Sequence, residues 1–261
     1  MRGRTKVISL AAMLLVIFAT SAIFTSGLVD VSRLSLFSTP IVPNQVPTVY
    51  VDPATIIMDY VNDPGFQIGD LLQVSVNITD ATDVFSYQVN VTWTTSMLNF
   101  TRVVSYGDFL AQTGSPYGTS RIEPTFIASN ATGSASVAET ILGDVAGVGG
   151  GGRLFTLEFL ILDYGCANIT ISSGGDLPTM LLDSAGATIS FSSADGYFKN
   201  KLFGDANSDR IVDIFDAATL SSRWTGAPGA LPYSRCVDNN DDGVIDIFDA
   251  AVTSANWGRT A

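Results

Sequence analysis

Oxygen-bearing side chains recur at alternate positions in two runs near the end of this 261-residue chain. The second run repeats the residue types of the first at an offset of 33 residues. The first run contains Asp205, Asn207, Asp209, Asp213 and Asp216, and the second contains Asp238, Asn240, Asp242, Asp246 and Asp249. Self-similarity at a fixed period indicates that one structural unit is built twice.

The spacing is that of a twelve-residue loop around a calcium ion, which takes about six to eight oxygen ligands. Side chains at the first, third and fifth places converge on one point, and the ninth place often acts through water. The seventh place gives a backbone carbonyl, here that of Ile211 or Val244. The twelfth ligand, Asp216 or Asp249, closes the site from the first turn of a helix. The sequence therefore predicts two Ca²⁺ sites.

Electrostatic repulsion within each run supports this prediction. Carboxylates about 4 Å apart at an effective dielectric constant of about 20 repel each other by roughly 4 kcal/mol per pair. We therefore expect the loops to open when no cation is bound. A solvated acidic turn is the simpler alternative, but it accounts for neither the alternation nor the repeat.

The two loops differ at their sixth place, where the chain bends through positive φ and glycine is favoured. The second loop has Gly243 there, whereas the first has Arg210. Arg210 introduces backbone strain and a positive charge near the ion. We therefore expect the first site to bind calcium more weakly.

Both runs lead into the same apolar segment, IDIFDAA, which we expect to begin a helix. Two such loop–helix units with Asp as the last ligand resemble the dockerin module over about 203–258. The resemblance implies that the residues before the last ligand contact a partner. They are Ile214 and Phe215 in the first copy and Ile247 and Phe248 in the second. Packing within the small calcium-bound core is the alternative role for these residues.

Residues 48–198 show alternating apolar and polar residues, as in Leu72–Ile78, Phe85–Trp93 and Phe155–Ile161. This period of two predicts half-buried strands, and turn residues separate them. We interpret the glycine run Gly149–Gly152 as one of these turns. Many short strands with no long helical pattern indicate a mainly β fold, an antiparallel β-sandwich.

The stretches 69–103, 141–162 and 181–198 resemble a cohesin domain, and the resemblance covers about 48–198. It implies a jelly-roll sandwich related to carbohydrate-binding modules, with an exposed sheet face that binds dockerin helices. With 199–261 as a small helical dockerin-like domain carrying two EF-hand-like loops, the chain resembles exported prokaryotic, in particular archaeal, cohesin–dockerin proteins.

The composition argues against catalysis and against nucleic-acid binding. The chain has no histidine, which excludes Ser-His-Asp and Cys-His systems, and it has only three glutamates. Its net charge of −12 disfavours nucleic acid and anionic membranes as partners. We therefore expect a protein that is not an enzyme.

The N-terminus reads as an export segment over 1–26, with Arg2, Arg4 and Lys6 before the apolar run Val7–Phe24. The run is compatible with a cleaved signal peptide or with an uncleaved membrane anchor. In both cases the remainder lies outside the cytoplasmic membrane, either secreted or at the cell surface. Residues 27–47, with three prolines, read as a linker.

Two further features fit an exported protein. Cys166 and Cys236 either form one disulfide between the sandwich and the tail or remain buried thiols. Five N-glycosylation sequons precede the tail, and their acceptors are Asn77, Asn90, Asn99, Asn130 and Asn168. Asn77 and Asn90 fall on the polar side of their strands, where we expect a glycan to be tolerated.

Three functions follow from these patterns. The first is a non-catalytic, calcium-dependent assembly protein whose partner is the cohesin or dockerin domain of another protein or of a like chain. The second is a carbohydrate-binding accessory protein in polysaccharide degradation. The third is a structural, calcium-stabilised surface protein without a dedicated partner.

Overall fold

The computed structural model describes residues 45–62, 66–111, 121–225 and 231–260. Residues 45–261 form one compact unit. The predicted leader, 1–26, and all but the last three residues of the predicted linker lie outside the described residues. In the described part, no helix is both long enough and apolar enough to cross a membrane.

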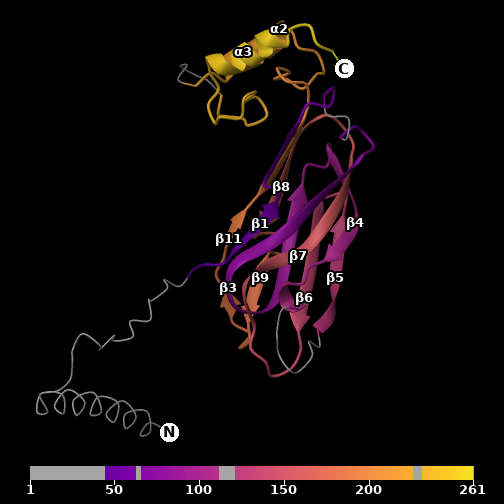
Figure 1. Cartoon of the computed structure of the whole chain (residues 1–261), viewed down its shortest axis with the longest axis vertical. Helices are drawn as coiled ribbons and strands as arrows, with labels where there is room; N and C mark the ends of the chain where they lie inside the picture. Colours follow the sequence, from indigo (N-terminus) through magenta and orange to yellow (C-terminus); the bar gives the residue numbers. More distant parts are fainter. Residues whose placement is uncertain (1–44, 63–65, 112–120, 226–230, 261) are drawn as a thin grey trace, which may run out of the picture. The chain divides into compact units, whose positions relative to one another are not determined.

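The larger part of the unit is a β-sandwich built around one long strand, β3 (Leu71–Trp93) (Figure 1). The first half of β3 pairs with β1 (Thr48–Asp52) and β7 (Val148–Ile161). The second half pairs with β6 (Ser134–Ile141), β8 (Gly165–Ser172) and β9 (Met180–Asp183). Because β3 belongs to both layers, it joins the two sheets at their centre.

The remaining strands extend these two layers outward. β4 (Leu98–Tyr106) pairs with β7, and β11 (Ser192–Ala194) pairs with β1 in parallel. β5 (Arg121–Ser129) pairs with β6, and β10 (Thr188–Ile189) pairs with β9. β12 (Gly196–Asn200) pairs with β8 and, in parallel, with β2 (Thr55–Met58). The 3₁₀ turn η2 spans Phe109–Ala111. The predicted mainly β sandwich is confirmed.

The sequence predicted two strands where the structure has the single strand β3. Asp80 and Asp83 adopt positive φ, at 56° and 55°, and the register with β7 shifts there. These bulges bend β3 without ending it. The predicted turn at Gly149–Gly152 is therefore wrong, because these glycines lie in β7 opposite the bend. A Cβ at the neighbouring Gly147 would lie only 2.4 Å from the Asp83 carbonyl, so the bend requires glycine there.

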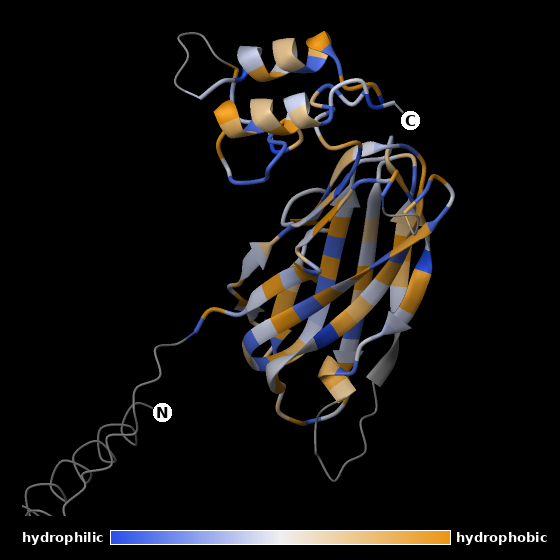
Figure 2. Cartoon of the chain, turned by 45° about the horizontal axis from the view of Figure 1, so that its top comes forward, coloured by the Kyte–Doolittle hydropathy of each residue, from blue (hydrophilic) through white to orange (hydrophobic). Residues whose placement is uncertain are grey.

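Alternation along the strands explains the core. Figure 2 shows apolar residues alternating with polar ones along the sandwich. On β3, Val89, Val91 and the predicted core residues Tyr87 and Trp93 point inward and are buried. Trp93 packs with Phe100 and Phe159 in tilted and edge-to-face geometry. Burial of such large apolar side chains is the main term that stabilises the sandwich.

The tail folds into two helices, α2 (Ile214–Ser222) and α3 (Ile247–Ala255), which lie side by side (Figures 1 and 2). Each begins at a capping box, in which Asp213 or Asp246 is the N-cap. The N-cap carboxylate accepts the N–H of Phe215 or Phe248, which would otherwise lack a helical partner. A small apolar cluster of Ala206, Leu220, Val237 and Ile245 packs beneath the helices.

Candidate calcium loops and their attachment to the sandwich

The predicted ligands occupy equivalent positions in the two loops. The first and twelfth residues are buried in both: Asp205 and Asp238 are at most 1% exposed, and Asp216 and Asp249 are fully buried. The third and fifth residues are exposed in both loops, and the ninth is half-buried. The repeat in the sequence is therefore a repeat in the structure.

Backbone amides from the middle of the loop hold the carboxylate of the first residue in each copy. The Asp205 carboxylate accepts the N–H groups of Asp209 and Arg210, at 3.2 and 3.0 Å. The Asp238 carboxylate accepts the N–H groups of Asp241 and Gly243, at 2.6 and 2.8 Å. The loop thus wraps around the carboxylate of its first residue.

The last ligand position ties the end of each loop to its start. Asp216 accepts the N–H groups of Asp213 and Asn207, at 2.7 and 3.1 Å. Asp249 accepts the equivalent N–H groups of Asp246 and Asn240, at 2.8 and 3.3 Å. The short Asp side chain can make these bonds only if the first helical turn lies close to the loop. The bonds therefore explain why the helix begins there.

The donor set of each loop fits a hard cation, because it offers only carboxylate, amide and backbone carbonyl oxygens. Burial raises the pKa of Asp205 and of Asp249, and the backbone N–H groups that they accept oppose this rise. Within the described residues, however, no three acidic, histidine or cysteine side chains form a group that could hold a metal ion. The carboxylates are instead turned toward backbone N–H groups.

The sixth residues follow the bend that the pattern requires, since φ is 75° at Arg210 and 88° at Gly243. The Arg210 guanidinium forms an ion pair with Asp163 in the β7–β8 turn. It also lies 5.5 Å from the ring centroid of Tyr164. The charge of Arg210 is therefore directed toward the sandwich.

The four predicted partner-binding residues are exposed. Ile214, Phe215, Ile247 and Phe248 each have 62–63% of their surface exposed, at the first turns of α2 and α3. The alternative that they pack the core of the tail is wrong, since that core is formed by other residues. Both copies present an Ile-Phe pair to solvent.

Two lysines, which the sequence analysis did not single out, lie beneath the tail. Lys199 at the end of β12 and Lys201 just after it are 2% and 1% exposed. The Lys199 ammonium donates to the carbonyl of Asp238, and that of Lys201 donates to the carbonyl of Cys236. Burial lowers the pKa of Lys199, and burial with the neighbouring Lys199 charge lowers the pKa of Lys201 to about 7.

The tail is attached to the sandwich at several points. Cys166 of β8 forms a disulfide with Cys236, which decides between the two alternatives for the cysteines. Arg259 near the C-terminus donates to both carboxylate oxygens of Asp59, at 2.8 and 3.2 Å. Val212 of the first loop packs with Tyr60 and Leu202. The tail is thus fixed to its own sandwich.

The second loop has ionic contacts of its own. Arg235 forms a salt bridge of 2.8 Å with Asp241 and donates to the hydroxyl of Thr55. Its guanidinium also lies 4.3 Å from the ring centroid of Tyr197, which is buried. The last strand of the sandwich, β12, ends at Asn200, whereas the predicted sandwich ended at 198. The short junction that follows it is closely packed against the second loop.

The sequon acceptors differ in exposure. Asn168 and Asn130 are exposed, and Asn77 and Asn99 are half-buried. Asn90 is only 7% exposed, so the expectation that its position tolerates a glycan is wrong for the folded protein. It points outward from its strand, but neighbouring strands and the segment after β8 enclose it.

No family model matches the chain, and no curated protein matches it. Solved structures of similar fold include a cohesin from the hyperthermophilic archaeon Archaeoglobus fulgidus, with 16% identity over 60% of this chain and 91% of that one and a TM-score of 0.43. A chain of a type I cohesin–dockerin complex from Clostridium thermocellum aligns with 10% identity over 60% of this chain and 99% of that one, at a TM-score of 0.44. A cohesin bound to a dockerin from Acetivibrio cellulolyticus aligns with 15% sequence identity. The alignment covers 60% of this chain and 99% of that one, with a TM-score of 0.46.

Proposed function

We propose that this chain is a non-catalytic assembly protein that acts outside the cytoplasmic membrane. Its tail, folded around two calcium ions, binds a cohesin or dockerin module of another protein or of a second copy of this chain. The observation that carries the proposal is the exposure of the same Ile-Phe pair in both copies of the repeat.

Exposed apolar pairs of this kind favour a partner. Transfer of about 100 Å² of apolar surface from water contributes on the order of 2.5 kcal/mol, so an exposed Ile-Phe pair is a substantial potential contribution to binding. Large aromatic side chains are also enriched among the residues that dominate interface energies. Because the tail is fixed to its own sandwich, these pairs remain available to another molecule.

Calcium has a structural role in this proposal. The residues that would hold it are Asp205, Asn207, Asp209, Ile211, Asp213 and Asp216 in the first loop and their counterparts in the second. A bound cation compensates the buried carboxylates and fixes the first turns of α2 and α3, where the apolar pairs lie. Partner binding is then calcium-dependent.

The test uses residues 45–261 and a double variant, Phe215→Ser with Phe248→Ser. Sedimentation velocity with calcium and with a chelator measures association between like chains. Cross-linking at the surface of the source cells identifies other partners. We expect association that requires calcium and is lost in the double variant.

A matched control removes two exposed apolar residues from the sandwich, by Ile68→Ser with Leu71→Ser. This control should leave association unchanged. If the wild-type protein makes no contact that depends on Phe215 and Phe248, the assembly function is wrong. A carbohydrate-binding protein or a structural surface protein without a dedicated partner would then remain.

A further inference from the structure

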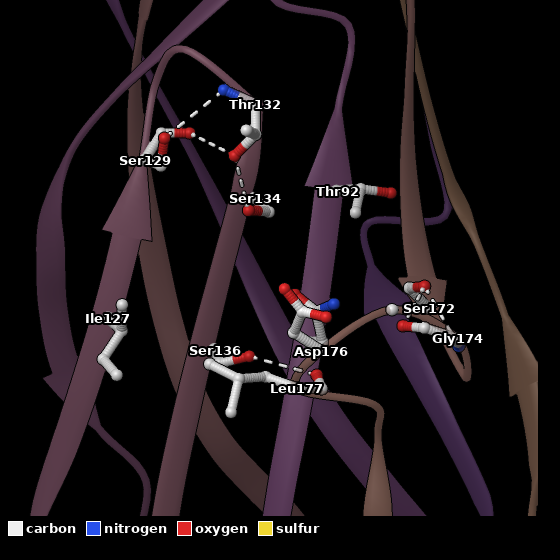
Figure 3. A pocket seen from close by; sticks show the side chains of 12 residues that line it. Thr92, Ile127, Ser129, Thr132, Ser134, Ser136, Ser172, Gly174, Asp176 and Leu177 are labelled. Atoms are coloured by element: carbon white, nitrogen blue, oxygen red, sulfur yellow. Dashed lines mark hydrogen bonds between the residues drawn. The ribbon is translucent and has the colours of Figure 1, made fainter.

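A polar groove of about 560 Å³ lies on the outer face of the sheet formed by β5, β6, β3 and β8 (Figure 3). The strand register places its floor in two rows of neighbouring residues. Ile127, Ser136, Asn90 and Ser172 form one row, and Ser129, Ser134 and Thr92 lie in the next. The groove is thus a property of the sheet.

The groove forms because its floor consists mainly of small residues, while the segment after β8 forms a wall along one side of it. The segment after β8 contributes Gly174, Asp176 and Leu177. The hydroxyl of Ser136 donates to the carbonyl of Leu177 at 3.3 Å, and the side chain of Gln88 donates to that of Pro178 at 2.8 Å. These bonds fix one wall in place.

Asn90 is the feature of the groove that points to a ligand. Its backbone N–H donates to the hydroxyl of Thr179, and its backbone carbonyl accepts from the same hydroxyl. The residue is only 7% exposed and lines the groove, and its side-chain amide atoms are not among the buried polar atoms that lack a partner. The amide is therefore open to the groove, where it can both donate to and accept from a bound hydroxyl.

The chemistry of the walls narrows the class of ligand. The lining residues, all in the described part of the chain, include no Lys or Arg, and Asp176 adds a negative charge. This combination disfavours phosphate and other anions. A single carboxylate is also too few for a metal site. What remains is a dense set of hydroxyls, each of which can both donate and accept.

We propose that this groove binds a neutral saccharide. Ser, Thr and Asn90 pair with the sugar hydroxyls, Asp176 accepts from one of them, and Ile127 offers an aliphatic surface to a ring face. The volume lies within the range of small-molecule sites in proteins. This binding function is separate from the assembly function of the tail.

A saccharide fits this face better than a protein partner does. The centre of a protein interface is depleted in polar groups and rich in aromatic residues and Arg. This groove offers Ile127 and Leu177 as its aliphatic residues, and no aromatic residue lines it within the described part.

The test uses residues 45–261 with cellohexaose, xylohexaose, mannohexaose and chitohexaose as probes. Saturation-transfer NMR detects weak binding, and titration measures the affinity. Asn90→Leu removes the amide from the floor, and we expect it to weaken binding at least tenfold. Asp176→Asn should weaken binding about threefold. Asn168→Leu, an exposed position near the other end of β8, is the matched control and should leave the affinity unchanged.

Each outcome decides the proposal. Absence of binding by all four probes overturns it, as does binding that survives both groove variants. If Asn90→Leu does not fold, Ser134→Val with Ser136→Val tests the same floor from the neighbouring strand. Mass spectrometry of the native protein is a further check, because a glycan attached to Asn90 itself would overturn binding of a free ligand. If a protein displaces the probes and itself depends on Asn90, the groove is a protein-docking site and the saccharide proposal fails.

The result is independent of the assembly function. The double variant of Phe215 and Phe248 should bind the probes as the wild type does. Loss of association with retained saccharide binding would separate the two functions, whereas failure of the saccharide test leaves the role of the tail intact.

Discussion

The two loops of the tail share most of their internal hydrogen bonds but meet the sandwich through different residues. In the first loop, the sixth residue, Arg210, reaches Asp163 and Tyr164. In the second, Cys236 lies two residues before the loop and is bonded to Cys166. The residues that depart from the repeat are therefore those that attach it to the sandwich.

The loops also differ in how firmly the first ligand is held. Asp205 accepts two backbone N–H groups. Asp238 accepts two as well, and in addition the hydroxyl of Tyr233 at 2.8 Å. Because of the extra donor and the glycine at its sixth place, we expect the second loop to be the better-prepared cation site. The repeat thus encodes two similar folds with unequal expected affinities for calcium.

The largest expected effect is the loss of stability when the first acidic residue of a loop is replaced, and it should differ between the two loops. Asp238→Ala leaves three donors without their acceptor, whereas Asp205→Ala leaves two. At about 1 kcal/mol per hydrogen bond lost, we expect a loss of stability of about 3 kcal/mol at Asp238 and about 1 kcal/mol less at Asp205. Urea unfolding of residues 45–261 in calcium measures both. Equal losses would contradict the ranking, and so would calcium titration with two binding events of equal affinity.

The next effect concerns the covalent link of the second loop. Replacing Cys166 and Cys236 by Ser should lower the free energy of unfolding by about 2–4 kcal/mol, because the link no longer restrains the unfolded chain. Hydrogen exchange should increase chiefly around 234–246. Cys166→Ser alone removes the same bond and should match the double variant. An increase of exchange confined to the first loop would show that the link does not hold the second.

A smaller effect is expected at the C-terminal contact of the first loop. Arg259→Ala leaves the buried Asp59 without its guanidinium partner, and bonds to charged groups contribute about 1.5–3 kcal/mol. Residues 258–260 pair with the first loop, through the bond from Val212 N–H to the Arg259 carbonyl. Exchange at Ile211 and Val212 should therefore rise. Arg223→Ala is the control, because the Arg223 guanidinium donates to the neutral carbonyl of Pro232. Similar melting temperatures for both variants would exclude a special role for Arg259.

The smallest effect on stability is expected for Arg210→Gly. Glycine relieves the cost of positive φ, about 1–2 kcal/mol, but its greater chain entropy costs about 0.5–1 kcal/mol, and the exposed ion pair with Asp163 contributes about 0–1 kcal/mol. These changes nearly cancel, so stability should change little. The calcium affinity of the first loop should rise toward that of the second. Arg210→Lys keeps the φ strain and the charge, and it should not show this rise. If the glycine variant binds calcium with unchanged affinity, Arg210 is not the cause of the difference in affinity between the two loops.

Much of the fold followed from local pattern. The alternation in Phe85–Trp93 predicted which side chains face the core, because successive side chains of a strand point to opposite faces. The repeat predicted the placement of α2 and α3, since the residue that ends each loop also lies in the first helical turn. The bend in β3 was missed because Asp80 and Asp83 resemble turn residues, and only the paired β7 shows that the strand continues.

The sequence by itself determined the strand faces, the two acidic loops and the apolar pairs at the helix starts, because each depends on residues within a few positions of one another. The tertiary structure alone decided the rest. Lys199, Lys201 and Arg259 gain their partners only when β12 and the C-terminus meet residues far away in the chain. Asn90 looked like an exposed sequon until β6, β8 and the segment around Leu177 enclosed it, because register between distant strands has no local signature.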